Sequence, residues 1–169
     1  MTKQPNGPRW LDVARQYVGI EEISGPRHNS TIIGWWGKIR ASFKDDETPW
    51  CAGFVGGVLE ECGIRSTRSA AARSYIKHGL RLKRPAVGCI VVFWRGKANG
   101  WSGHVGFVVG KDKRGNLMVL GGNQGNAVNI KAFTKNRVLG YFWPGIAPFP
   151  ERYNLPVIAG DGRVSTNEA

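Results

Sequence analysis

A cysteine in this sequence has the setting of a nucleophile. Cys51 follows Pro49 and Trp50 and opens a segment whose apolar residues recur at three- and four-residue intervals, which predicts a helix that begins at the cysteine. A thiol at a helix N-terminus lies against unpaired N–H groups and the positive end of the helix dipole, and both favour the thiolate. We therefore expect Cys51 to be able to attack a carbonyl carbon.

A histidine later in the chain has the setting of the matching base. His104 lies between Gly103 and Gly106, at the head of a run of β-forming residues. Imidazole titrates near neutral pH, so it can take a thiol proton and return it to a leaving group. His28 lies in a polar loop and His78 ends a predicted helix, so neither has this setting.

A polar cluster at residues 121–124 supplies a candidate for the third group, which must accept a hydrogen bond from the imidazole and fix its orientation. Asn123 is our choice. Gln124 is the alternative, because a one-residue change of register moves a side chain to the other face of a sheet. We expect the backbone N–H of Cys51 to supply part of an oxyanion hole.

The elements that must position these residues change in kind along the chain. The apolar spacing predicts helices in the first half, over 8–19, from Asn29 or Ser30 to Trp36, over 50–62 and from Ser69 to His78. Beyond Pro85 it predicts strands, over 87–94, 104–109, 117–120, 127–133 and 138–143. Helices followed by consecutive strands indicate an α+β fold, with the N-terminal helices packed on an antiparallel sheet of five to six strands.

The length and the cysteines limit the architecture. The chain has 169 residues, enough for one domain with a proper core, and no apolar run approaches the ~18 residues of a membrane span. We expect one catalytic domain over 1–150, a partly flexible extension over 151–169, no signal peptide and a monomer. Cys62 and Cys89 fit core positions, and the cysteine spacing suits neither a disulfide scaffold nor a metal, so we expect no metal and no cofactor.

The net charge of +12 indicates an acidic partner. Nucleic acid, anionic lipid headgroups and bacterial envelope polymers would all be attracted, and charge alone does not choose among them. Three acids, Asp45, Asp46 and Glu47, stand just before Cys51. We interpret them as residues that cap or fix the loop.

Taken together, the three motifs resemble those of the CHAP and NlpC-type cysteine peptidoglycan hydrolases, and most of all a small phage-associated group. The resemblance runs from about Trp10 to Pro144 and is carried, in order, by Pro-Trp-Cys-Ala at 49–52, Gly-His-Val-Gly-Phe-Val at 103–108 and Gly-Gly-Asn-Gln at 121–124. It implies a papain-like fold that cleaves amide bonds of bacterial cell-wall peptide.

The resemblance also implies roles for single residues: Cys51 as nucleophile, His104 as base and Asn123 as orienting residue. Many CHAP domains have an acidic residue two positions before that asparagine. Here the position is Gly121, so the sequence departs from a four-membered catalytic set. An amidase and an endopeptidase would use the same three residues, so the bond that is cut stays open.

A basic catalytic domain without an export signal resembles an endolysin for a Gram-negative host, held in the cytoplasm until a membrane pore releases it to the cell wall. Its expected partners are peptidoglycan and anionic envelope polymers. A type VI-secreted amidase effector is the nearest alternative. A basic nucleic-acid-binding module is the alternative from another class, because the chain combines Arg/Lys-rich segments with seven tryptophans. Trp10, Trp35 and Trp94 fall at apolar-periodic positions, which favours core packing, so we expect no nucleic-acid partner.

Overall fold

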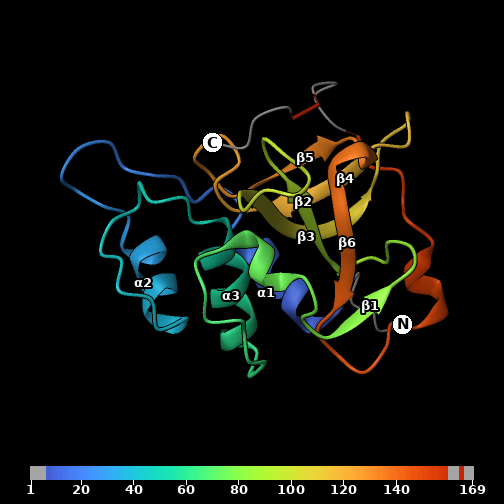
Figure 1. Cartoon of the computed structure of the whole chain (residues 1–169), viewed down its shortest axis with the longest axis horizontal. Helices are drawn as coiled ribbons and strands as arrows, with labels where there is room; N and C mark the ends of the chain where they lie inside the picture. The colour runs from blue at the N-terminus through green and yellow to red at the C-terminus, as the bar shows by residue number, and fades with distance from the viewer. Residues whose placement is uncertain (1–6, 160–163, 166–169) are drawn as a thin grey trace.

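The structure is a computed structural model that describes residues 7–159 and 164–165. The described residues form three α-helices and one six-stranded antiparallel sheet, so the predicted α+β class is confirmed (Figure 1). The helices are α1 (Arg9–Gln16), α2 (Ser30–Lys38) and α3 (Cys51–Glu61), with 3-10 turns η1 (Ala72–Tyr75), η2 (Lys135–Arg137) and η3 (Pro150–Tyr153). The strands are β1 (Leu80–Leu82), β2 (Ile90–Trp94), β3 (Gly103–Lys111), β4 (Leu117–Gly121), β5 (Asn129–Phe133) and β6 (Val138–Trp143).

The sheet places its longest strand, β3, in the interior. The strand order is β1-β6-β2-β3-β4-β5, and β3 pairs with β2 on one side and β4 on the other. Phe93 of β2 stands opposite His104 of β3. The polar cluster follows β4 directly, so the histidine and this cluster come from neighbouring strands, as the sequence predicts.

Helix α3 lies between α2 and the sheet (Figure 1). It is buried from Cys51 to Leu59, and glycines on its surface let α2 approach closely. A Cβ at Gly53 would lie 3.0 Å from the Trp36 ring, and a Cβ at Gly57 would collide with Trp35. Glycine lowers intrinsic helix propensity by about 1 kcal/mol per residue, so tertiary packing stabilises this helix.

The starts of α2 and α3 differ in a way that bears on the site. Asn29 caps α2, because its side-chain oxygen accepts a hydrogen bond from the N–H of Thr31 at 2.9 Å. Trp50 precedes α3 and makes no side-chain capping hydrogen bond. The first N–H groups of α3, beginning at Cys51, are therefore not capped by that side chain.

The predicted helix over 69–78 is wrong. Only the short turn η1 forms there, and Ile76, which follows it, is extended. The reason is a long-range contact: the guanidinium of Arg73 binds carbonyls of the loop between β2 and β3, and this tertiary contact overrides local propensity. The sequence pattern also does not predict β1, a three-residue strand that pairs with β6 at the edge of the sheet.

Part of the segment after residue 150 packs on the sheet. The N–H of Val87 donates to the carbonyl of Arg152 at 2.7 Å, and the N–H of Ile158 donates to the carbonyl of Lys111 at 2.7 Å. The division at residue 150 stays a prediction. Within the described residues, no helix is long and apolar enough to cross a membrane.

Candidate active site

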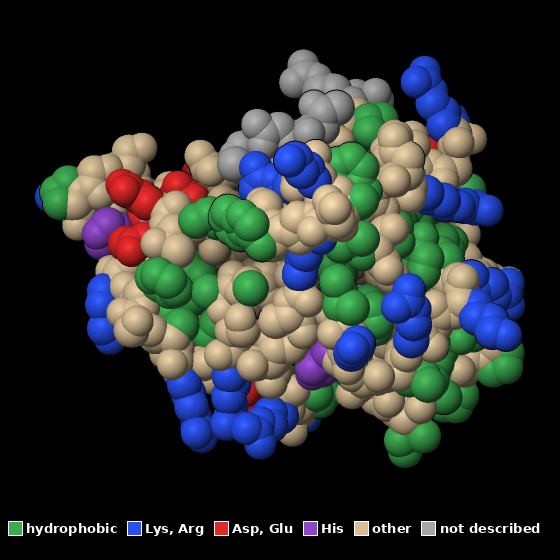
Figure 2. All heavy atoms as spheres, viewed as in Figure 1, with side chains coloured by type: hydrophobic (Ala, Val, Ile, Leu, Met, Phe, Trp, Pro, Cys, Tyr) green, Lys and Arg blue, Asp and Glu red, His purple; other side chains and the backbone are tan. Residues whose placement is uncertain are grey.

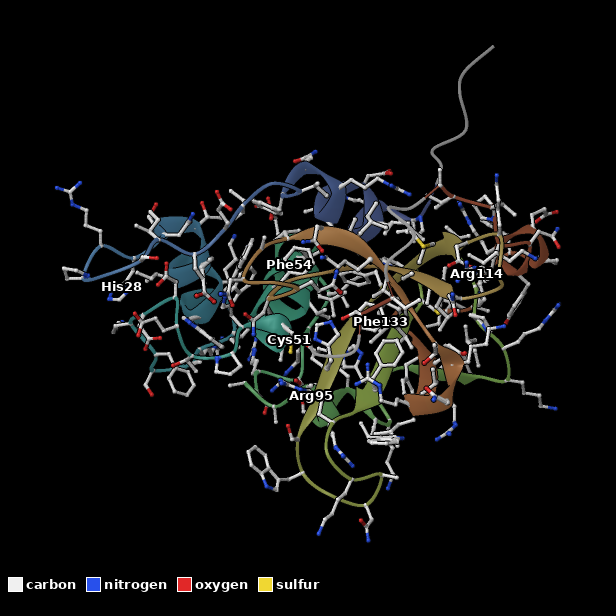
Figure 3. The ribbon with its side chains drawn as sticks, turned by 90° about the horizontal axis from the view of Figure 1, so that it is seen from above. His28, Cys51, Phe54, Arg95, Arg114 and Phe133 are labelled. Atoms are coloured by element: carbon white, nitrogen blue, oxygen red, sulfur yellow. The ribbon has the colours of Figure 1, made fainter. Side chains whose placement is uncertain are left out.

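Cys51 is the first residue of α3, and its thiol is almost fully buried. Burial raises the pKa of this thiol above its usual value, although the N–H groups of Val105 and Ala52 and the charge of Arg95 act in the opposite direction. Figure 3 shows Arg95 close to Cys51. The helix start does favour the thiolate, as expected, but desolvation outweighs it, so the resting thiol is mainly protonated and needs a base.

His104 is held as a buried ring in a fixed plane. It stacks on Phe133, with ring centroids 5.5 Å apart and planes at 11°, and on Phe93 at 6.3 Å and 26°. The next residue along β3, Val105, is the one whose backbone N–H acts on the Cys51 thiol. The fold therefore brings the cysteine to the segment of β3 that carries the histidine, as the sequence predicts.

Gln124 fixes both the orientation and the tautomer of His104. Its Oε1 lies 3.0 Å from Nε2 of the ring. The amide nitrogen of Gln124 donates to the carbonyls of Val119 and Asn129, at 3.2 and 2.9 Å, so the oxygen must be the atom that faces the ring. An amide oxygen can only accept, and Nε2 of His104 therefore carries the proton. The lone pair is left on Nδ1, where a base needs it.

The CHAP domain family model matches residues 43–123. The matched segment begins in the loop before Cys51, contains His104 and ends at Asn123. This match supports a cysteine- and histidine-dependent amidase or peptidase activity on peptidoglycan. A search of curated proteins finds no match to this chain.

Gly121 stands where many CHAP domains have an acidic residue, and this difference explains why Gln124 contacts the imidazole. A Cβ at Gly121 would collide with Oε1 of Gln124 and would lie 3.3 Å from Nε2 of His104. The space that an acidic side chain would need at 121 is thus filled by the Gln124 amide. The hydrogen bond at Nε2, which the sequence predicts for Asn123 with Gln124 as the alternative, is made by Gln124.

Asn123 is buried and has a positive φ of 57°. Asparagine is one of the few non-glycine residues that adopt this left-handed conformation readily. Its visible role is therefore to turn the chain so that the next side chain, that of Gln124, points back at β3. The geometry of the turn alone decides which of Asn123 and Gln124 contacts the imidazole. In the sequence, only the glycine at 121 signals that geometry.

Within the CHAP-matched segment, two acids fix the loop before the nucleophile, as predicted. Asp45 accepts hydrogen bonds from the N–H groups of Glu47 and Thr48, at 2.9 and 2.6 Å. Asp46 is fully buried and accepts from the N–H groups of Ile23 and Asn29, both at 2.8 Å. Burial opposes the ionisation of Asp46, but its hydrogen bonds prevail and hold its pKa below the usual value.

Residues 20–22, which lie outside the segment matched by the CHAP model, connect this loop to the turn that carries Gln124. The indole N–H of Trp50 donates to Oε1 of Glu22 at 2.8 Å. The N–H of Glu22 donates to the carbonyl of Asn126, and the N–H of Val128 donates to the carbonyl of Ile20. The loop before the nucleophile and the turn that orients the histidine are thus linked through a third segment.

The three cysteines are free thiols, and Cys89 is fully buried in the core. Among residues 7–159 and 164–165, no group of three or more His, Cys, Asp or Glu side chains could hold a metal ion.

Proposed function

We propose that this protein is a phage endolysin-like hydrolase that cleaves amide bonds in the peptide part of peptidoglycan, with Cys51 as nucleophile. The observation that carries the proposal is the hydrogen bond between Gln124 and Nε2 of His104, because it leaves the Nδ1 lone pair as the base. The CHAP domain match, which covers Cys51 and His104 and ends before Gln124, supports the class of substrate.

The first half of the reaction forms a thioester. Nδ1 of His104 takes the proton from the Cys51 thiol as sulfur attacks the carbonyl carbon of the scissile amide. The backbone N–H of Cys51 donates to the oxyanion that develops. Oε1 of Gln124 stabilises the imidazolium, which then gives its proton to the departing amine as the C–N bond breaks.

The second half releases the acid product. Water enters where the amine left, and Nδ1 of His104 takes one of its protons as the oxygen attacks the thioester carbon. The C–S bond breaks, the carboxylic acid leaves, and the imidazolium returns its proton to the sulfur of Cys51. The imidazole and the thiol end in their starting protonation states.

The charge distribution supports an envelope target. Lys and Arg side chains are spread over much of the face shown in Figure 2, whereas Asp and Glu side chains gather at one end beside a histidine. Three of the basic residues, Lys111, Lys113 and Arg114, are exposed where β3 turns into β4, and Figure 3 shows Arg114 well away from Cys51. We assign these charges to binding of anionic envelope polymers and not to the chemical step.

The test is loss of turbidity of outer-membrane-permeabilised Gram-negative cells. Wild-type protein and Cys62→Ala should lyse them, while Cys51→Ala and His104→Ala should fall to background with unchanged circular dichroism. Cys62 is the matched control because it is a free thiol on the far end of the same helix. Lysis by Cys51→Ala at the wild-type rate would overturn the proposal.

A further inference from the structure

The loop between β2 and β3 exposes a tryptophan close to the site. Trp101 is 88% exposed, unlike Trp35, Trp36 and Trp50, which are fully buried. It stands three residues before His104, and three residues span at most ~10 Å of extended chain. The backbone that carries the indole therefore lies within ~10 Å of the backbone of His104, near the end of β3 that carries the histidine.

Arg73 holds this loop in place. Its guanidinium donates three hydrogen bonds to loop carbonyls: to Ser102 and Ala98 at 2.8 Å each, and to Lys97 at 2.7 Å. The N–H of Gly100 also donates to the carbonyl of Lys97 at 3.1 Å. Because the backbone of this loop is already fixed, binding at Trp101 costs less conformational entropy than it would on a mobile loop.

The surroundings of the indole favour a small, flat ligand. The loop neighbours of Trp101 are polar or small, and Lys97 and Asn99 are exposed beside it. A tryptophan offers roughly 150–250 Å² of contact, far below the about 1,000 Å² that a stable protein interface needs. A single aromatic face with a polar rim matches the C–H face of a sugar ring whose hydroxyl and amide groups reach outward.

We propose that Trp101 binds a pyranose ring of the glycan strand, so that the amide which Cys51 attacks is the one that joins the peptide to the sugar chain. This inference rests on the proposed function and narrows it. An amide deep in the stem peptide would place the nearest sugar several residues from the thiol. An amide next to the glycan places the nearest sugar within the reach of Trp101.

The kinetic test uses two soluble substrates, a glycan-linked muropeptide and the lactoyl form of the same stem peptide, which keeps the scissile amide but has no sugar ring. Trp101→Ala should raise KM for the glycan-linked substrate about tenfold with kcat little changed, and should leave the sugar-free peptide unaffected. Ile146→Ala is the matched control, because Ile146 is 99% exposed and comes after the last strand. Equal losses on both substrates, or no difference between the two variants, would overturn the inference.

Arg73→Ala provides a second variant. If Arg73 acts by presenting Trp101, Arg73→Ala should raise the same KM. The Arg73→Ala/Trp101→Ala double variant should then have a KM no higher than that of Trp101→Ala alone. Additive losses would contradict a shared role.

A binding measurement separates this inference from the proposed function. The disaccharide of N-acetylglucosamine and N-acetylmuramic acid should quench tryptophan fluorescence of Cys51→Ala, which cannot turn over, and should not quench the Cys51→Ala/Trp101→Phe double variant. Quenching without lytic activity in the wild type would refute the proposed function and leave the sugar site standing. Lysis without Trp101-dependent quenching would refute the sugar site alone.

Discussion

Nε2 of His104 and Oε1 of Gln124 lie 3.0 Å apart, and the direction of this hydrogen bond is fixed by the other contacts of the glutamine. The pair comes from β3 and from the turn after β4, two parts of the chain separated by 20 residues. It determines which ring nitrogen can accept the thiol proton. The proposed chemistry depends on this relationship more than on any other contact.

The first prediction separates the two neighbours in the turn. Gln124→Ala should lower kcat on the order of 10²-fold or more, because the imidazole loses its orienting acceptor and the imidazolium loses a partner. Asn123→Gly should keep most activity, since glycine adopts a positive φ without strain. The measurement is the rate of peptidoglycan solubilisation with matched circular dichroism. A larger loss for Asn123→Gly than for Gln124→Ala would restore Asn123 as the orienting residue.

The second prediction concerns Asn129, which holds the glutamine. Its side-chain oxygen accepts from the Gln124 amide at 3.0 Å, and its own amide donates to the Gln124 carbonyl at 2.8 Å. Asn129→Ala should lower kcat by about tenfold with KM unchanged and should alter the pH–rate profile, because it frees the residue that sets the tautomer of His104. A variant that lost stability but kept the wild-type pH profile would show that Asn129 is only structural.

The third prediction concerns the thiol of Cys51. Burial raises its pKa, so alkylation by iodoacetamide should accelerate as the pH rises past ~8.5, the ordinary value for cysteine. Arg95→Gln should move this profile to higher pH, because the guanidinium charge lowers the pKa of the thiol. Arg114→Gln removes the same charge far from Cys51 and is the control (Figure 3). Identical profiles for the two variants would contradict the electrostatic role of Arg95.

The fourth prediction concerns Asp46, which fixes the loop before the nucleophile. Asp46→Ala leaves two backbone N–H groups without their acceptor and should lower the free energy of unfolding by about 3 kcal/mol at pH 7. Because its pKa is held below the usual value, the contribution of Asp46 is present above pH ~4 and is lost as the pH falls further.

Urea unfolding at pH 7 and pH 3 tests this sign. The gap between wild type and Asp46→Ala should shrink at pH 3, whereas the exposed Glu47→Ala should stay near wild type at both pH values. A gap of the same size at pH 3 would show that the carboxylate charge does not matter.

The sequence predicted those features that local pattern controls. The start of α3 at Cys51 followed from Pro49, Trp50 and the apolar spacing, and the strands around His104 followed from β-branched runs. The absence of a helix over 69–78 could not be predicted, because it depends on the Arg73 side chain, which binds a loop about 25 residues away. The choice between Asn123 and Gln124 depended on one positive φ, and the pKa of Cys51 depended on burial by elements distant in the chain.

Cys51 of this protein is proposed to hydrolyse an amide of peptidoglycan. Mass spectrometry of purified sacculi digested by wild-type protein and by folded Cys51→Ala tests it most directly. We predict that the wild type releases fragments with a new free amine, on the alanine next to the lactoyl group if the sugar inference holds, and that Cys51→Ala releases none. New reducing sugar ends with every amide intact, or the same amines from Cys51→Ala, would contradict the claim.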